Sequence, residues 1–235
     1  MTSRETVLAG GRTTKGVVRI GDTVRRPPGT NAAFVRCLLR HLEAQGFEQV
    51  PRHLGADDLG REVFTYVSGS VPENLGHHQD STLVEAAKLI RRYHDATVAL
   101  FATREAMAAG IEVACHNDLS PCNTVFRDGR PVALIDFDAA APGSRAFDLG
   151  YAAWLWLDVG SPNYPAGEQL RRLRSFTDGY GPGPTTAELT DAMLRRQRIV
   201  MAEAERHGKT GMGEWAAACR RWTIAHLCPE IAHSA

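Results

Sequence analysis

The stretch from residue 116 to residue 138 constrains the fold more than any other part of the chain. It reads H-N-D-L-S-P-C-N, then a short alternating segment, then a second apolar segment that ends in L-I-D-F-D. Asp128-Gly129 in the middle is a strong signal for a tight turn between two antiparallel strands. Because a hairpin brings its two ends together, the sequence predicts that the polar residues at these ends meet.

The polar side chains at the two ends of this hairpin are oxygen donors. Asp118 and Asn123 precede the first strand, and Asp136 and Asp138 follow the second. Mg²⁺ takes carboxylate, amide and phosphate oxygens as ligands. We therefore expect one magnesium site at the open end of the hairpin. A single Asp or Asn in a loop is commonly a turn or capping residue, so this prediction depends on the whole set.

The order and spacing of these residues resemble the phosphotransfer site of the protein-kinase-like superfamily. The similarity is greatest to its aminoglycoside phosphotransferase and choline kinase branch, whose catalytic loop reads H-x-D-x-x-x-x-N and is followed by I-D-x-[DE]. Here the matching residues are His116, Asp118 and Asn123, followed by residues 135–138. Residues 147–150 resemble the family's D-L-A/G segment. Short polar strings recur by chance, so the three pieces carry the resemblance together.

The resemblance implies a role for each of these side chains in phosphoryl transfer. Asp118 would orient the acceptor hydroxyl and accept its proton, and His116 would brace the loop through hydrogen bonds. Asn123 and Asp136 would hold Mg²⁺ against the nucleotide phosphates, and Asp138 would assist with the metal. We therefore expect catalytic residues on the loop and metal ligands at both ends of the hairpin.

The rest of the sequence predicts an α+β fold with two lobes, which is the protein-kinase-like arrangement. Residues 1–68 contain short strand candidates and one amphipathic helix, so we expect a small antiparallel sheet as the N-lobe. Residues 69–235 contain several long helical segments around the hairpin, so we expect a mainly helical C-lobe. Within it, Asp148 is expected either to pin the catalytic loop or to cap the helix that follows.

Hydrophobic periodicity and turn signals place the individual elements. The predicted strands are 7–9, 17–20, 23–26, 52–56, 61–67, 124–127 and 132–135. The predicted helices are 31–45, 82–101, 146–157, 167–179, 185–207 and one from residue 214 onward. Asn31 is the expected N-cap of the first helix, and Thr185 has capping-box spacing to Glu188.

By resemblance, the nucleotide would lie beneath the N-lobe sheet. Gly11 belongs to a glycine-bearing loop between two strands, which would cover the phosphates. This loop lacks the full G-x-G-x-x-G spacing, and a flexible hairpin is an equally good reading of it alone. Thr65, Tyr66 and Val67 fall in the connector between the lobes, whose backbone would hold the adenine edge.

The chain departs from the family pattern at the phosphate-binding cation. The family usually places a lysine on the third strand and a glutamate in the next helix. Here the third strand has no lysine, and no acidic residue lies between Asn31 and His41. Arg25 is the expected replacement for the lysine, with Arg26 next, while Glu43 comes late in the helix. Arginine keeps the charge but replaces a point charge with a planar fork. The missing pair keeps open the alternative of a catalytically weak or inactive nucleotide-binding protein.

Composition disfavours several classes of protein. The net charge is zero and the pI is about 7.1, whereas nucleic-acid binders are usually basic. No apolar run approaches the length of a membrane span, and the first residues lack an apolar signal core. The five cysteines show no C-x-x-C pair, which favours reduced thiols. We therefore expect a cytoplasmic protein with neither a nucleic acid nor a membrane as partner.

These observations predict a small-molecule kinase that moves the γ-phosphate of ATP or GTP to a hydroxyl group with Mg²⁺. An aminoglycoside-like or amino-alcohol acceptor is implied by the resemblance alone. A metallohydrolase built from His116, Asp118 and Asp136 is a second alternative, because such residues can ligate zinc or manganese. It would need further histidine ligands, and His77 and His78 are the nearest in the sequence.

Overall fold

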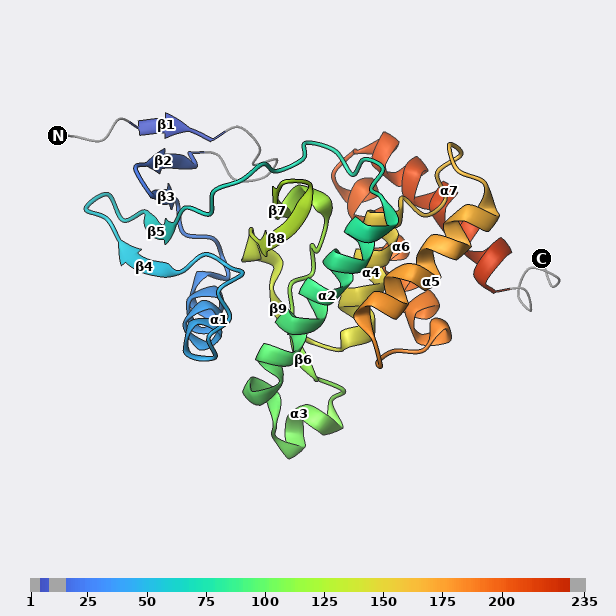
Figure 1. Ribbon diagram of the computed structural model, residues 1–235, viewed down its shortest axis with the longest axis horizontal. Helices are drawn as coiled ribbons and strands as arrows, with labels where there is room; N and C mark the ends of the chain where they lie inside the picture. Colours follow the sequence, from blue (N-terminus) through green and yellow to red (C-terminus); the bar gives the residue numbers. More distant parts are fainter. Residues whose placement is uncertain (1–4, 9–15, 229–235) are drawn as a thin grey trace.

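The computed structural model describes residues 5–8 and 16–228 and shows a mixed α+β fold, as predicted (Figure 1). A five-stranded sheet occupies one end of the molecule, and most of the helices gather at the other. All neighbouring strands in this sheet are antiparallel, in the order β1-β2-β3-β5-β4. The strands are β1 Glu5–Val7, β2 Val18–Ile20, β3 Thr23–Arg26, β4 His53–Ala56 and β5 Glu62–Thr65.

Helix α1 (Ala32–Ala44) lies beside this sheet and buries one apolar stripe (Figure 1). The buried residues are those expected from the periodicity: Val35, Leu38, Leu39 and Leu42. Asn31 does occupy the N-cap position of α1, but its side chain makes no capping hydrogen bond. Its Nδ2 instead donates to the carbonyl oxygen of Ala140 at 2.5 Å. The start of α1 is thereby tied to a segment more than one hundred residues further along the chain.

The predicted hairpin between residues 124 and 135 is confirmed. Strand β7 (Thr124–Arg127) pairs with β8 (Arg130–Leu134) in antiparallel register. Asp128 and Gly129 form the turn with φ angles of 50° and 74°, the left-handed pair that a tight hairpin turn requires. The amide of Ile135 donates to the carbonyl of Asn123 at 2.9 Å, so the pairing extends to the open end of the hairpin.

Helices build the rest of the core. The bounds are α2 Asp80–Thr97, α4 Arg145–Leu157, α5 Ala166–Tyr180, α6 Thr186–Arg206 and α7 Thr210–Leu227. Helix α2 packs on α5, α4 packs on α6, and α6 packs on α7. Large side chains fill the space between them, among them Tyr93, Trp154, Trp156, Phe176 and Tyr180. No described helix combines the length and the apolar character that a membrane span requires.

Several boundaries differ from those predicted. Strand β1 ends at Val7, whereas the prediction ran on to Ala9, which lies outside the described residues. Helix α7 begins at Thr210, four residues before the predicted start at residue 214, and therefore includes Gly211 and Gly213. A glycine costs a helix only about 1 kcal/mol, which burial of Ala216 and Cys219 against the core offsets.

Three short elements were not predicted. They are α3 (Arg104–Ala108), β6 (Val113–Cys115) and β9 (Ala141–Gly143). Strands β6 and β9 pair with each other, and the hairpin lies between them in the sequence. Each has only three residues, so neither carries a periodic signal of its own. Their pairing fixes the two segments that enter and leave the region around the hairpin.

The chain leaves β5 and crosses from the sheet to α2 through residues 66–79 (Figure 1). On the way it bonds to the hairpin, because Ser70 and Phe126 exchange backbone hydrogen bonds of 2.8 and 2.9 Å. The segment that connects the sheet to α2 is therefore hydrogen-bonded to β7. The domain boundary between residues 68 and 69 stays a prediction.

Candidate active site

The loop that follows β6 holds Asp118 and Asn123 in direct contact. The amide nitrogen of Asn123 donates to the Asp118 carboxylate at 2.7 Å and to its backbone carbonyl at 3.0 Å. The short 3₁₀ helix Pro121–Asn123 between them brings the two side chains round to one side. Because the amide nitrogen is committed to Asp118, the amide oxygen is the atom that Asn123 can offer to a cation.

Asp136 and Asp138 converge at the other end of the hairpin. Asp136 adopts a left-handed backbone conformation with φ of 64°, which ends β8 in a sharp turn. Both carboxylates contact the guanidinium of Arg26: Nη1 lies 3.2 Å from Asp136 Oδ1, and Nη2 lies against Asp138 Oδ2. The structure therefore brings the two carboxylates onto a single cation from the sheet.

The environment of Asp118 changes its acid strength. Burial raises the pKa of this carboxyl, and the nearby Asp136 carboxylate raises it further. His116, the hydrogen bond from Asn123 and the charge of Arg196 oppose this effect, but the net pKa stays above the ordinary value. Raised basicity of this kind suits a group that accepts a proton in the reaction.

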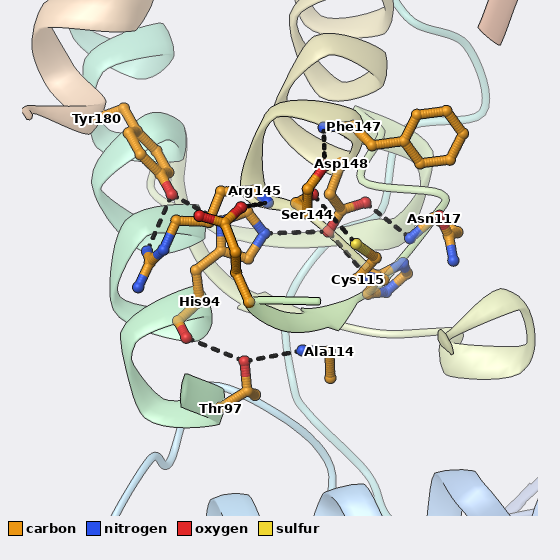
Figure 2. Close-up of polar contacts among 12 residues, drawn as sticks. His94, Thr97, Ala114, Cys115, Asn117, Ser144, Arg145, Phe147, Asp148 and Tyr180 are labelled. Carbon is orange, nitrogen blue, oxygen red and sulfur yellow. Dashed lines mark hydrogen bonds and ion pairs between the residues drawn. The ribbon is translucent and has the colours of Figure 1, made fainter. Parts of the chain in front are cut away.

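Asp148 pins the catalytic loop from behind (Figure 2). Its carboxylate is fully buried and accepts hydrogen bonds from the backbone amides of His116 and Asn117, both at 2.8 Å. The capping role falls to Ser144, whose hydroxyl accepts from the Phe147 amide at 3.3 Å. Of the two roles expected for Asp148, the structure thus shows the first.

A chain of polar groups that begins with the buried His94 and Tyr180 supports Asp148 in turn (Figure 2). His94 of α2 lies 3.1 Å from its carboxylate and 2.8 Å from the hydroxyl of Tyr180. Arg145 donates to the same hydroxyl at 3.1 Å and pairs with Asp95 at 2.7 Å. Three helices, α2, α4 and α5, therefore meet behind the loop.

His116 joins the catalytic loop to the end of β8. Its Nε2 donates to the backbone carbonyl of Ile135 at 3.0 Å, and its ring packs against Phe137 at 4.5 Å between centroids. The side chain is fully buried, and its Nδ1 has no hydrogen-bond partner among the described residues. These contacts are those of a brace, and the catalytic assignment of His116 stays a prediction.

Asn117 is held by contacts that the sequence did not predict. This residue is left-handed with φ of 65°, and its Nδ2 donates to the Ala139 carbonyl at 2.9 Å. Arg196 of α6 donates to its side-chain oxygen, and the guanidinium lies 4.0 Å from the ring centre of Phe147 and 4.7 Å from that of Tyr151. Asn117 and Arg196 are 79 residues apart, so no local pattern could link them.

A cavity of about 360 Å³ opens between the sheet and the hairpin. Three of the predicted connector residues, Thr65, Tyr66 and Val67, line it. The predicted Gly11 lies outside the described residues. The other lining residues that bear on the site come from both parts of the chain: Val24, Arg26, Glu62, Phe64, Asn123, Ile135, Asp136 and Asp138.

The order expected for the two arginines of β3 is reversed in the structure. Arg26 lines the cavity, whereas Arg25 is absent from its lining and pairs with Asp57 at 3.4 Å. Successive residues of a strand point to opposite faces of the sheet, and Val24 and Arg26 share the face that looks into the cavity. Arg25, the expected replacement for the family's lysine, therefore lies outside the cavity lining, and Arg26 is the arginine of β3 that lines it.

A buried carboxylate on β5 was also missed. Glu62 is only 4% exposed, lines the cavity and stands opposite Arg26 in the sheet register. Its Oε1 lies 3.5 Å from Arg36 and 3.5 Å from His53. The sequence did contain a signal for this residue. Glu62 and Phe64 are two residues apart in a predicted strand, so their side chains point to the same face of the sheet. Glu43, the only acidic residue within α1, instead pairs with Arg52 at 3.5 Å.

The oxygen donors at the hairpin suit Mg²⁺, which usually takes one or two carboxylates together with substrate phosphates. Two carboxylates already share one cation, and the amide of Asn123 lines the same cavity. Within the described residues, no three His, Cys, Asp or Glu side chains could hold a metal without such outside ligands. The metallohydrolase alternative consequently lacks a site there, and His77 instead stacks on Tyr164 at 4.7 Å.

The chain is similar to known proteins across this region and beyond it. Residues 97–189, which include the catalytic loop and the hairpin, match the family model described as "Phosphotransferase enzyme family". The trifolitoxin immunity protein of Rhizobium leguminosarum bv. trifolii is 34% identical over 193 residues, which cover 74% of this chain and 73% of that protein.

Solved structures share the fold over nearly the whole chain. A spectinomycin phosphotransferase in complex with ADP and spectinomycin has a TM-score of 0.65 at 12% identity, over 96% of this chain and 93% of that one. A choline/ethanolamine kinase family protein from Mesorhizobium loti has a TM-score of 0.61 at 16% identity, over 96% and 92%. These likenesses confirm the protein-kinase-like fold. Taken with the sequence matches, they show that the chain belongs to the phosphotransferase enzyme family.

Proposed function

We propose that this protein transfers the γ-phosphate of ATP or GTP to a hydroxyl group of a small molecule. The observation that supports the proposal is a cavity between the sheet and the hairpin that is lined by Asn123, Asp136 and Asp138, with Asp118 in direct contact with Asn123. An acceptor of the aminoglycoside or amino-alcohol class is the finer part of the proposal. Structural neighbours named as spectinomycin phosphotransferase and choline kinase support that class.

Each side chain has one task in this proposal. Asp118 orients the acceptor hydroxyl and accepts its proton, for which its raised pKa suits it. Asn123, Asp136 and Asp138 would hold Mg²⁺, which supplies neutralising charge for the phosphates when bound. Arg26 adds a second positive charge from the sheet, and the backbone of residues 65–67 would hold the base of the nucleotide. His116 and Asp148 keep the loop in position.

Turnover of the Asp118→Ala variant tests this proposal. Purified protein is incubated with Mg²⁺ and ATP or GTP, with and without a panel of aminoglycosides and amino alcohols, and nucleotide consumption is measured. Loss of the base should reduce turnover about 10²- to 10⁴-fold while nucleotide binding persists. Asp191→Asn is the matched control, because Asp191 is exposed on α6 and pairs with Arg195 one turn further along the same helix. Equal turnover in wild type and D118A contradicts the proposed role.

A second candidate function is protection by binding, with little or no catalysis. It is supported by the relative named as a trifolitoxin immunity protein and by the replacement of lysine by arginine on β3. In this case nucleotide or toxin would raise the melting temperature while no acceptor promoted turnover. If mass spectrometry detected phosphorylation of the bound partner, the result would support phosphoryl transfer, the first candidate function, instead of protection by binding.

We also propose that the protein acts in the cytoplasm. No disulfide joins any of its five cysteines, which all lie in described residues, and reduced thiols are typical of that compartment. Fractionation of cells that express the protein checks this proposal. Recovery in a membrane or secreted fraction would contradict it.

A further inference from the structure

Glu62 is a buried carboxylate without a good partner. It is 4% exposed, and its Oε1 makes no hydrogen bond with any described residue. Its contacts to Arg36 and His53 are both long, at 3.5 Å. Burying a charged carboxylate is costly unless it is paired and hydrogen-bonded. A positively charged side chain that formed a hydrogen bond with the Glu62 carboxylate when a ligand occupies the cavity would offset this cost.

The neighbours that Glu62 has now are weak ones. Burial lowers the pKa of His53 despite the nearby carboxylate, so this ring is mainly neutral at physiological pH. The side chain of Arg36 is 42% exposed, so water competes for its guanidinium. Neither side chain therefore satisfies the carboxylate.

The sheet register places a stronger partner directly opposite. Arg26 of β3 is paired with Glu62 of β5, and Val24 with Phe64. All four residues line the cavity, so their side chains share one face of the sheet. Directly opposite residues of an antiparallel pair have Cβ atoms about 5 Å apart, well within the length of an arginine side chain. The guanidinium of Arg26 can reach Glu62 by side-chain rotation alone.

Arg26 has a reason to move. In the structure its guanidinium lies on Asp136 and Asp138, the two carboxylates that would bind Mg²⁺ if the proposed function is correct. A guanidinium and a metal ion cannot occupy the same carboxylate oxygens, and their like charges repel. A metal ion that takes Asp136 Oδ1 and Asp138 Oδ2 would therefore displace the Arg26 guanidinium from both aspartates.

We propose that Glu62 is the positioning residue that receives Arg26 when Mg²⁺ and nucleotide bind, an inference that rests on the proposed function. A charge-assisted hydrogen bond between them would hold the guanidinium at the cavity wall, where it faces the phosphates. Glu62 on β5 thus supplies the carboxylate that α1 lacks near its start. The sheet itself carries both members of the pair.

A double-mutant cycle tests this pairing. The dissociation constants of ATP and GTP are measured by calorimetry, with Mg²⁺ and with EDTA, for wild type, Glu62→Gln, Arg26→Gln and the double variant. E62Q should weaken binding in Mg²⁺ about tenfold and change binding in EDTA less than about twofold. The double variant should bind no more weakly than R26Q. The control is Glu43→Gln, which removes an exposed carboxylate of α1 outside the cavity.

The NMR signal of the Arg26 side-chain Nε–H gives a second measurement that does not need the variant to be stable. In wild type this signal should shift on addition of Mg²⁺ with ATP, and it should reach the same position in E43Q and in Glu62→Asp. In E62Q it should shift to a different position, because the guanidinium leaves the aspartates but finds no carboxylate on β5. Additive effects of R26Q and E62Q, or wild-type affinity in E62Q, would overturn the pairing while leaving the proposed function intact. Failure of the wild type to bind either nucleotide would overturn both.

Discussion

Asp148 accepts hydrogen bonds from two successive amides of the catalytic loop and contacts His94 of α2. Asp148→Asn should destabilise the fold by about 3 kcal/mol, because it removes a buried charge from its partners. Turnover should fall as well, since His116 and Asn117 lose their support. Urea unfolding with matched activity assays measures both effects. Asp191→Asn, at an exposed position, should change stability by less than about 0.5 kcal/mol.

The same substitution should change the pH dependence of stability. Burial acts to raise the pKa of Asp148, but the hydrogen bonds from His94 and His116 and the charges of these histidines hold the pKa below its ordinary value of 3.8. Between the lowered folded pKa and 3.8, the unfolded chain binds a proton that the native state does not, so stability is lost as the pH falls. Unfolding curves across acid pH should therefore be flatter for D148N than for wild type. Parallel curves would contradict this role.

The sequence predicted the hairpin between residues 124 and 135 because its turn signal is local. As a result, Asn123, Asp136 and Asp138 line one cavity, and Asp118 contacts Asn123. The choice between Arg25 and Arg26 depends on the face that β3 presents, which is fixed by pairing with β5. Residue types alone do not reveal this register, and for that reason Arg25 was expected ahead of Arg26.

At the scale of elements, α4 and α6 approach each other closely at Gly150. A Cβ atom there would lie 2.8 Å from the Cβ of Ala192 and 3.0 Å from the carbonyl oxygen of Leu189. Gly150→Ala should therefore push the helices apart and cost about 2 kcal/mol. Because α4 also carries Asp148, turnover should decrease too. Denaturant unfolding and activity assays measure these effects.

Gly211 of α7 is the matched control for this helix contact. A Cβ atom at Gly211 would have no neighbour within 4 Å, so Gly211→Ala should stabilise the protein by about 0.5 kcal/mol. Equal effects of the two substitutions would show that helix propensity, rather than the contact between α4 and α6, controls stability at Gly150.

The long elements were predictable because each carries its own periodic pattern. The stripe in α1 and the capping box at Thr185 are examples, and the structure shows both. Strands β6 and β9 have three residues each and gain their structure from a partner about thirty residues away. The start of α7 was missed because packing against the core outweighs the low helix propensity of glycine. Such tertiary effects leave no mark on a short window of sequence.

At the scale of the whole molecule, the cavity is walled by both the sheet and the hairpin. A ligand that binds there should therefore stabilise both parts together. With Mg²⁺ and ATP or GTP at one hundred times its dissociation constant, the linkage effect is about 2.7 kcal/mol. For a chain of this size, that corresponds to a rise in Tm of about 5–10 °C. Thermal unfolding followed by fluorescence measures this shift.

Asp136→Asn separates the contribution of the metal from that of the nucleotide. Asparagine tolerates the left-handed backbone at this position, so the turn should persist while one carboxylate charge is lost. We expect the Mg²⁺-dependent part of the Tm shift to disappear and the shift in EDTA to remain. A full Mg²⁺-dependent shift in D136N would exclude this carboxylate as a metal ligand.

Two side chains from the region of β3 and α1 contact the same short segment after β8. Arg26 contacts Asp136 and Asp138, and Asn31 donates to the Ala140 carbonyl. A displacement of the sheet would therefore be transmitted to residues 136–140 through Asn31, whereas the loop before Asp118 is held by Asp148 of α4. The position of the sheet and the distance between the proposed base and the proposed metal ligands would thus change together. Substitutions that stiffen the connector would consequently alter the chemical step along with nucleotide exchange.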